Sequence, residues 1–290
     1  MKNKLPNGLY AAFDLGSASL KAVVIEATDS RLRLATLEEN SLKQITDFPD
    51  EQEYRVHLCE SLQNISSRIP LKDCQKISIL FSHREMQIKV IELPSEIQID
   101  QIEKVLNWEA KKLLAPNFRD EPYAFSYKIV RESPFTVALA VIPQRILEKH
   151  IELFENAKIK VDSAFAEVFG AHSLKDAIDN TGLPALSIVN FGSSGTHLQI
   201  FSAGELRFYR HIPSGMNELS NPPKETELEM YSQKIRFSFD YFRAVSKLSQ
   251  IDAVFFMGGG AAHPDILPYQ RSYFNPTRVN IVDISATIDI

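Results

Sequence analysis

Asp14-Leu15-Gly16-Ser17-Ala18-Ser19 is the stretch that decides the fold, because it joins two apolar runs, Leu9 to Asp14 and Leu20 to Glu26. Both runs have the composition of β-strands, and Gly16 lets the backbone between them turn sharply and approach a ligand closely. Ser17, Ser19 and the backbone N–H groups of the turn are hydrogen-bond donors of the kind that cradle a phosphate. Asp14 could hold Mg²⁺ through water, and Lys21 could add positive charge. By itself such a turn is more often a plain hairpin.

The same layout returns in the second half of the chain. Ala185 to Phe191 is strand-like, and Asn190-Phe191-Gly192-Ser193-Ser194-Gly195-Thr196 then leads into the strand-like runs His197 to Phe201 and Leu206 to Ile212. A third turn, Gly258-Gly259-Gly260, follows the buried-looking strand Ala253 to Met257, and we expect Ala261 and Ala262 to open a helix. Glycines at such a point let a flat group lie on the backbone.

Two matching turns predict two copies of one supersecondary unit, and therefore two lobes. Together with the triple glycine they predict a nucleotide site, if nucleotide binding is retained. The residues expected to line it are Asp14, Gly16, Ser17, Ser19, Lys21, Asn190, Gly192, Ser193, Thr196, Gly258, Gly259 and Gly260. The expected cofactor is ATP with Mg²⁺ held at Asp14, or none.

The bulk composition narrows the class of protein. The chain has 290 residues, of which 44% are hydrophobic and 24% charged, with a formal net charge of −5. This is ordinary globular composition, and the absence of basic runs gives no indication of a nucleic-acid or anionic-membrane surface. Cys59 and Cys74 form no metal or disulfide pattern and predict free thiols in a reducing compartment. No run approaches the roughly 20 apolar residues of a membrane helix, so we expect membrane contact only through partners.

Hydrophobic periodicity predicts alternating strands and helices between and after the turns. Helices are expected at Tyr54–Ile69, Ile99–Leu114, Gln144–Ala157, Phe169–Ile178 and Glu227–Leu248. Further strands are expected at Arg31–Leu37, Lys76–Phe81, Glu85–Leu93, Tyr123–Val130, Thr136–Ile142 and Val161–Phe165. The favoured interpretation buries Trp108 against a sheet, with exposure at a partner groove as the alternative. Four aromatic residues of the last helix are interpreted mostly as core between the lobes: Phe237, Phe239, Tyr241 and Phe242.

The three turns resemble the two phosphate loops and the adenosine loop of the actin/hexokinase/chaperone ATPase superfamily, and within it the PilM family. Ala12 to Val23 resembles the opening strand-turn-strand of PilM, and Phe208-Tyr209-Arg210-His211-Ile212-Pro213-Ser214-Gly215 resembles the strand and turn after the second phosphate loop. Ile91-Glu92-Leu93-Pro94, followed by Val105 to Ala110, resembles the inserted subdomain that PilM shares with the division protein FtsA.

The resemblance implies an α/β, actin-like or RNase H-like two-lobed fold with an inserted α+β subdomain in the first lobe. It places the first lobe at residues 1–80 and 162–184, the inserted subdomain at 81–161, and a shortened second lobe at 185–290. The second lobe is called shortened because only a brief loop separates Gly215 from the last long helix. The wall of the nucleotide site that PilM builds there is therefore expected to be missing.

The resemblance also implies a function. PilM-like proteins are cytoplasmic scaffolds of the type IV pilus platform, peripheral to the inner membrane, and bind the N-terminal peptide of the membrane protein PilN beside the inserted subdomain. Other pilus or secretion components, including an assembly ATPase, are further expected partners. Asn190 stands where the superfamily usually has an aspartate; it is neutral and cannot act as a base, so hydrolysis should suffer more than binding. The resemblance thus implies a degenerate ATPase fold without catalytic residues.

Two alternatives stay open. One is a GspL-like cytoplasmic domain of a type II secretion platform, which differs in its partner and in having a membrane segment beyond residue 290. The other is an active ATP-dependent enzyme of the actin/hexokinase superfamily. The sequence offers no convincing catalytic base for such an enzyme, and Asn190 argues against hydrolysis.

Overall fold

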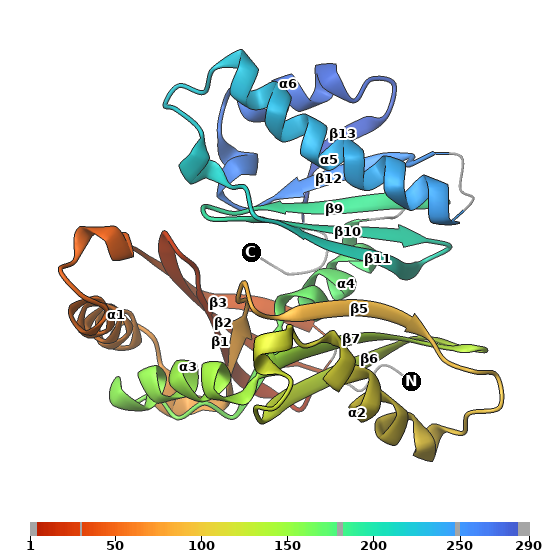
Figure 1. Ribbon diagram of the computed structural model, residues 1–290. Helices are drawn as coiled ribbons and strands as arrows, with labels where there is room; N and C mark the ends of the chain where they lie inside the picture. The colour runs from red at the N-terminus through yellow and green to blue at the C-terminus, as the bar shows by residue number, and fades with distance from the viewer. Residues whose placement is uncertain (1–4, 30, 179–181, 247–249, 284–290) are drawn as a thin grey trace.

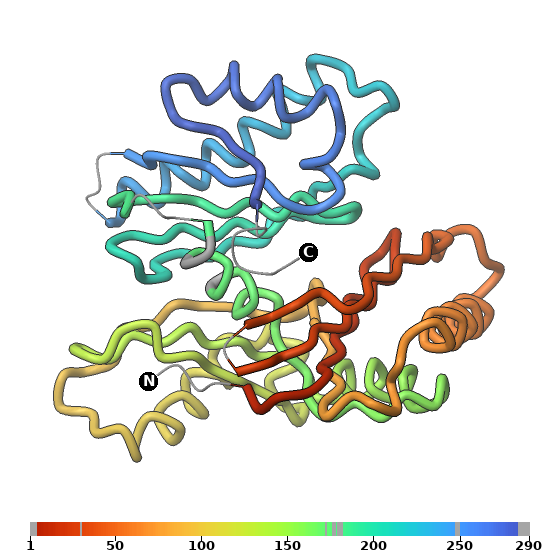
Figure 2. Tube along the Cα trace, turned by 180° about the vertical axis from the view of Figure 1, so that it is seen from behind, coloured from red at the N-terminus to blue at the C-terminus, as the bar shows by residue number. Residues whose placement is uncertain are grey.

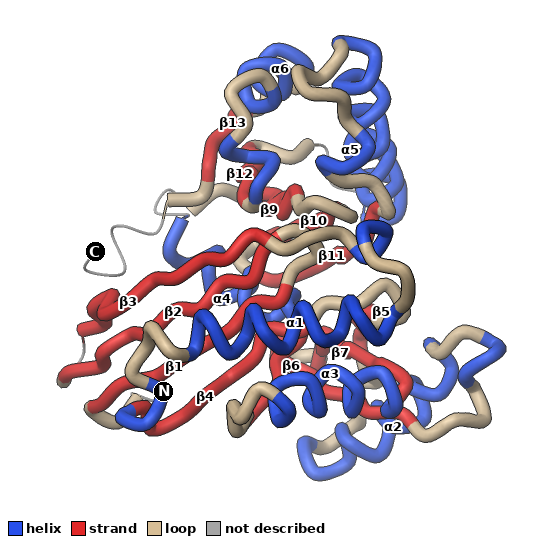
Figure 3. The backbone as a smooth tube through the Cα atoms, turned by 90° about the vertical axis from the view of Figure 1, so that its left-hand side faces the viewer, coloured by secondary structure: helices blue, strands red, loops and turns tan. Residues whose placement is uncertain are grey.

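The computed structural model describes residues 5–29, 31–178, 182–246 and 250–283, and these residues form three β-sheets with helices packed against them (Figure 1). Alternating apolar residues build the strands, and helices cover the outer faces of the two larger sheets, as the side view shows (Figure 3). None of the described helices is long and apolar enough to span a membrane.

The first sheet contains the N-terminal strands and has the order β3-β2-β1-β4-β8. Its strands are β1 (Gly8–Leu15), β2 (Ser19–Thr28), β3 (Arg31–Ser41), β4 (Cys74–Phe81) and β8 (Ser163–Ala166). The first three strands are antiparallel neighbours, while β4 runs parallel to β1 and β8 parallel to β4. Helices α1 (Glu51–Ser66) and α3 (Gln144–Asn156) contribute Leu62 and Phe154 to the core of this sheet. In the rear view β1, β2 and β3 of this sheet form the red end of the trace (Figure 2).

The second sheet repeats this pattern with the order β11-β10-β9-β12-β13. Its strands are β9 (Ala185–Phe191), β10 (Thr196–Ser202), β11 (Glu205–Ile212), β12 (Ala253–Met257) and β13 (Arg278–Ile281). Again three antiparallel strands come first, and two parallel strands follow. Helices α5 (Glu225–Ser246) and α6 (Ile266–Tyr273) pack on its outer face. The predicted duplication of one supersecondary unit is therefore confirmed.

The third sheet is formed by the chain between β4 and β8 of the first sheet and has the order β5-β7-β6. It contains β5 (Gln87–Glu92), β6 (Tyr123–Glu132) and β7 (Phe135–Pro143), and α2 (Ile102–Leu113) packs on one face. The opposite face packs against the second sheet through Ala138 and Ala140, which share a cluster with Leu186 and Phe201. Because both faces are covered, seven consecutive residues of β7 are apolar after its first two positions, and the strand is buried almost throughout.

Helix α4 (Glu167–Ile178) leads from the first sheet towards the second and packs in the same cluster through Val168 and Ala171. This cluster also includes Ala166, the last residue of β8, so it connects the edge of the first sheet with the second sheet and the β5-β7-β6 sheet. Single-turn 3₁₀ helices connect the remaining elements, at Ile45–Asp47, Leu71–Asp73, Ile99–Gln101, Pro116–Phe118, Met216–Glu218 and Gly259–Ala262.

The structure corrects several local predictions. The triple glycine leads into a 3₁₀ turn, and α6 begins only at Ile266, so Ala261 and Ala262 do not open that helix. Trp108 is 63% exposed, and the ammonium group of Lys112 lies over its ring instead of a sheet. The predicted end of the long helix at Leu248 lies outside the described residues.

The aromatic residues of α5 are divided between two faces. Phe239 and Phe242 are buried in the core of the second sheet, as expected of core residues, although this core lies within one lobe. Phe237 and Tyr241 are exposed, contrary to the prediction. Sequence periodicity did not separate the two pairs, because aromatic residues occupy both the inner and the outer face of the helix.

Candidate functional site

The first glycine turn is closed by a backbone hydrogen bond in which Gly16 N donates to Ser19 O over 3.0 Å. Asp14 stands opposite Lys21 in the β1–β2 ladder. The Lys21 ammonium donates to Ser19 Oγ at 2.8 Å and lies 3.6 Å from a carboxylate oxygen of Glu39. The positive charge predicted at Lys21 is therefore present, but its ammonium group is bonded to Ser19 and lies near Glu39 of the same sheet.

The pKa of Asp14, at the start of this turn, is raised above its ordinary value. Its side chain keeps access to solvent, yet the surrounding protein removes enough water to raise its pKa above the ordinary value. The positive charge of Lys21 opposes this rise, and the negative charge of Glu167 adds to it. Holding Asp14 ionised here therefore costs free energy.

The second glycine turn has the same closure, with Gly192 N donating to Gly195 O over 3.0 Å. Its first hydroxyl is already engaged, because Ser193 Oγ donates to Asn217 Oδ1 over 2.7 Å. The backbone supports this contact, since Asn217 N donates to Ser193 O over 2.9 Å. The turn is thus fixed by protein partners on both its backbone and its side chain.

Thr196 ends the same turn but places its hydroxyl in the core of the second lobe. Its Oγ1 donates to Ser214 O over 2.7 Å and shares a hydrogen bond with the Tyr231 hydroxyl at 3.1 Å. Thr196 is fully buried. Its side chain therefore serves packing in this structure, and a role in binding nucleotide stays a prediction.

A chain of side-chain hydrogen bonds connects the two glycine turns. Gln44 Nε2 donates to Ser17 O over 3.3 Å, and Gln44 Oε1 accepts from Asn217 Nδ2 over 3.1 Å. Asn217 in turn accepts from Ser193. We call these four residues, Ser17, Gln44, Asn217 and Ser193, the loop bridge. It joins the first turn to the second across a sequence separation of 173 residues between Gln44 and Asn217.

The triple-glycine turn packs directly on the end of β9. Gly258 has a φ of +84°, and a Cβ at this position would lie 2.7 Å from Phe191 O. Gly259, by contrast, has no neighbour within 4 Å of such a Cβ and faces open space. Glycine is therefore required at Gly258 by both conformation and close packing, while Gly259 presents bare backbone to solvent.

Glu167, the first residue of α4, is the main site residue that the sequence analysis missed. It accepts a hydrogen bond from Asn190 Nδ2, and its other oxygen lies 3.6 Å from His197 Nε2. It also acts electrostatically on Asp14. Acidic residues are common in the first turn of a helix because the helix dipole favours them. The only signal in the sequence was its place directly after a short strand.

His197 extends this cluster towards the other sheets. Its Nδ1 lies 2.6 Å from the Tyr209 hydroxyl, and its Nε2 lies 3.2 Å from Ser82 Oγ, next to the first lobe. The centroids of the His197 and His211 rings lie 4.8 Å apart, with the ring planes tilted by 33°. Burial and the neighbouring imidazole lower the pKa of His211. Burial and the charge of Glu167 raise the pKa of Tyr209. Together these residues form a half-buried polar cluster, with Glu167 at its centre.

The geometry brings together most of the predicted residues but leaves few of their side chains available. The hydroxyls or amides of Ser19, Asn190, Ser193 and Thr196 all bond to other protein groups. Among the described residues, no group of three or more histidine, cysteine or carboxylate side chains could hold a metal ion. Because these hydroxyls and amides are already bonded within the protein, the side chains of the turns do not fit a tightly held Mg-ATP.

We compared the sequence and the structure with those of known proteins. No protein-family model and no curated protein sequence matches the chain. A solved structure of a PilM–PilN type IV pilus biogenesis complex matches over 98% of this chain and 91% of that chain, with a TM-score of 0.79 and 14% identity. A protein of unknown function with an actin-like ATPase fold, from Bacteroides thetaiotaomicron, matches over 98% and 93%, with a TM-score of 0.56 and 10% identity.

The cytoplasmic domain of EpsL, an inner-membrane component of the type II secretion system of Vibrio cholerae, is also similar. It matches over 86% of this chain and 82% of that domain, with a TM-score of 0.51 and 10% identity. These likenesses confirm the predicted actin-like fold and its similarity in structure to PilM. At 10–14% identity they establish the fold alone.

Proposed function

We propose that this protein is a cytoplasmic scaffold of a type IV pilus assembly platform and binds the N-terminal peptide of a PilN-like inner-membrane protein. The observation that carries the proposal is the similarity to a PilM–PilN complex over 98% of this chain at a TM-score of 0.79. The peptide anchors the protein at the cytoplasmic face of the inner membrane, and an assembly ATPase is a further partner. Groove recognition of a peptide relies on pockets and backbone contacts, so it requires no catalytic machinery.

In this proposal nucleotide binding is weak or lost. Asn190 is neutral and donates to Glu167, and Ser193 is held in the loop bridge. A nucleotide phosphate therefore has to compete with existing protein hydrogen bonds for these groups. This supports a scaffold over an active ATP-dependent enzyme, which needs the same groups for phosphate and metal. Detection of steady ATP hydrolysis by the purified protein would favour the active enzyme over the scaffold.

The proposed lobes follow the sequence division, at residues 1–80 with 162–184, 81–161 and 185–290. Helix α3 lies within residues 81–161 but contributes Leu153 and Phe154 to the core of the first sheet, so it packs with the first lobe. We therefore expect the peptide groove beside the β5–β7 sheet and α2. An exposed aromatic residue lies on that helix, at Trp108.

The test is calorimetric titration with a synthetic peptide that carries the cytoplasmic N-terminal residues of the PilN-like protein from the same organism. We expect saturable binding at one peptide per chain, and none with a scrambled peptide. Trp108 is the single tryptophan of the chain, so its fluorescence reports on the same titration whether the peptide lies near α2. Absence of heat with the native peptide would contradict the proposal.

The secretion alternative is supported by the likeness to the cytoplasmic domain of EpsL, although its TM-score is only 0.51. The two functions differ in their membrane partner. Parallel titration with the cytoplasmic segment of a type II secretion membrane protein separates them, because a scaffold specific to one system should bind only the matching segment. Stronger binding to the secretion segment would favour the GspL-like role.

A further inference from the structure

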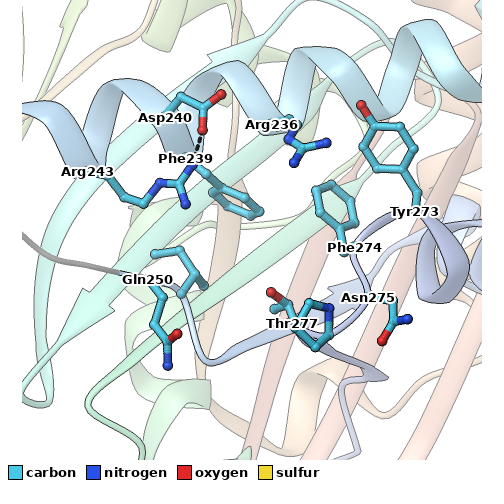
Figure 4. Close-up of a pocket in the computed structure, with 11 residues that line it drawn as sticks. Arg236, Phe239, Asp240, Arg243, Gln250, Tyr273, Phe274, Asn275 and Thr277 are labelled. Carbon is cyan, nitrogen blue, oxygen red and sulfur yellow. Dashed lines mark hydrogen bonds and ion pairs between the residues drawn. The ribbon is translucent and has the colours of Figure 1, made fainter.

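A surface pocket of about 280 Å³ lies on the second lobe, between α5 and the loop that joins α6 to β13. Figure 4 shows side chains of the helix on one side of it and side chains of the loop on the other. Among the described residues, none that lines the pocket belongs to the three glycine turns. The pocket is therefore separate from the candidate site described above.

Packed core residues form both walls of the pocket. Phe239 of α5 and Phe274 of the loop are buried in the core of the second lobe, and their ring centroids lie 5.7 Å apart. Two backbone hydrogen bonds fix the loop: Phe274 N donates to Gln270 O over 3.0 Å, and Thr277 N donates to Phe274 O over 2.8 Å. A ligand therefore does not have to order these walls, which removes one of the free-energy costs of binding.

One arginine gives the pocket its net charge. Arg236, Asp240 and Arg243 line the helical wall at i, i+4 and i+7 spacing, which places them on one side of α5. Asp240 and Arg243 form an ion pair, so their charges compensate each other. No other charged side chain of the described residues lines the pocket, so two arginines against one aspartate leave a formal charge of +1.

The remaining acidic side chains at the start of α5 lie away from the pocket. Glu225, Glu227 and Glu229 belong to the first two turns of the helix, and none of them lines it. Glu229 precedes Arg236 by about 10 Å along the helix axis, at 1.5 Å per residue. It accepts a hydrogen bond from Gln233, while Glu227 accepts from Ser220. These acids therefore leave the charge of Arg236 uncompensated.

The guanidinium group of Arg236 keeps its N–H groups available. Within the described residues it forms no ion pair and no hydrogen bond, and its central carbon lies 5.7 Å from the centroid of the Tyr273 ring. Such a contact between a cation and an aromatic face orients the side chain without using its hydrogen-bond donors. Figure 4 shows Arg236 projecting from the helix towards the loop residues. A planar fork of unused donors therefore borders the pocket.

The loop adds two further donors on the other side of the pocket. The Thr277 hydroxyl and the Asn275 amide both line it, and neither side chain has a hydrogen-bond partner in the described part of the chain. Figure 4 shows the two residues across from the helix. Both walls of one cavity thus carry donors that the protein itself does not use.

We propose that this pocket binds the phosphate group of a small phosphorylated molecule. The Arg236 guanidinium contacts the phosphate in the bidentate geometry that suits oxyanions, and Thr277 and Asn275 donate to its remaining oxygens. A carboxylate has only two oxygens, which one guanidinium already satisfies, whereas the three terminal oxygens of a phosphate can reach donors on both walls. This inference does not depend on the proposed pilus function.

The volume of the pocket limits the rest of the ligand. Sites for small molecules usually enclose about 300–1,000 Å³, and this pocket lies just below that range. It therefore fits a phosphate with a small body and does not enclose a nucleotide, so Mg-ATP is not the expected ligand.

The probe is phenyl phosphate, titrated into the full chain at constant ionic strength and followed by two-dimensional NMR of the backbone amides. We expect saturable shifts that are largest at Asn275 and Thr277, and none with phenol, which has the same ring without the phosphate. Benzoate should bind more weakly than phenyl phosphate, because it leaves the loop donors unused. Arg236→Gln should weaken binding of phenyl phosphate about tenfold, because it removes the charge-assisted hydrogen bonds.

Matched variants separate the pocket from general surface effects. Thr277→Val keeps the shape of the side chain but loses the hydroxyl, and should weaken binding about threefold. Arg119→Gln removes an exposed arginine after the Pro116–Phe118 turn and should leave binding unchanged.

Four results would overturn the inference. Phenyl phosphate could give no saturable shifts, or Arg236→Gln could leave its binding unchanged. The largest shifts could fall at the glycine turns, which would place the phosphate there. Benzoate could bind as tightly as phenyl phosphate, which would assign the pocket to a carboxylate.

Discussion

At the scale of single residues, Asn190 and Glu167 define the character of the site. The side-chain amide of Asn190 donates a hydrogen bond to the Glu167 carboxylate. This bond partners a half-buried carboxylate whose negative charge also acts on Asp14. An aspartate at position 190 would oppose Glu167 without a bound cation between them. The asparagine therefore stabilises the site in the absence of metal.

Asn190→Asp should destabilise the protein by about 1–3 kcal/mol at neutral pH, because it replaces a hydrogen bond with repulsion between carboxylates. The two acids would raise each other's pKa in the folded state. Their stability contribution is then complete below the ordinary pKa values and is lost as pH rises, so the defect should shrink towards pH 4. Urea unfolding across this range measures it. Asn117→Asp, at an exposed position, is the control; an equal loss in both variants would refute the explanation.

Asp14→Asn should stabilise the protein at neutral pH. The folded-state pKa of Asp14 is raised, so its favourable contribution is present below pH 3.8 and is lost as pH rises through the folded-state value. Removing the carboxyl group removes that loss, and the gain over the native protein should therefore grow from pH 3 to pH 7. Urea denaturation at several pH values tests this. A variant less stable than the native protein at pH 7 would contradict it.

At the scale of elements, the loop bridge connects the two glycine turns through the side chains of Gln44 and Asn217. Gln44→Ala and Asn217→Ala should be coupled by about 0.5 kcal/mol in a double-mutant cycle, since the bond is exposed and its net contribution is small. Equilibrium unfolding of the two single variants and the double variant measures the coupling. Gln44→Ala combined with Asn117→Ala should be additive, because these residues share no contact. A coupling of zero for the first pair would show that the bridge does not form in solution.

Much of this architecture could be predicted at the scale of elements. The alternation of apolar residues located the strands, and the strand-turn-strand around Gly16 and its repeat around Gly192 predicted the duplicated sheets. Contacts between distant residues could not be predicted, because nothing local to Gln44 indicates Asn217 as its partner. Glu167 was missed since an acid at a helix start has an ordinary explanation in the dipole. The outward direction of Phe237 was missed because aromatic residues also fill the inner face of α5.

At the scale of the whole molecule, Mg-ATP at millimolar concentration should leave the thermal unfolding temperature unchanged. A ligand at a hundredfold excess over its dissociation constant stabilises the folded state by about 2.7 kcal/mol, which such a scan detects readily. The side chains of the turns are already bonded to protein, so we expect no such binding. The Gln44→Ala, Asn217→Ala double variant, in which Ser193 is released, is the informative comparison. A clear upward shift for the native protein would contradict a scaffold that has lost its nucleotide.

The apolar cluster shared by α4, β7 and the inner face of the second sheet has a mechanical consequence. Separating the lobes would expose Ala138, Leu186 and Phe201 to water, and this exposure is unfavourable in proportion to the apolar area uncovered. A hinge motion that separates the second sheet from the inserted sheet would therefore cost free energy. The inserted sheet and the second sheet should therefore move together as one rigid unit.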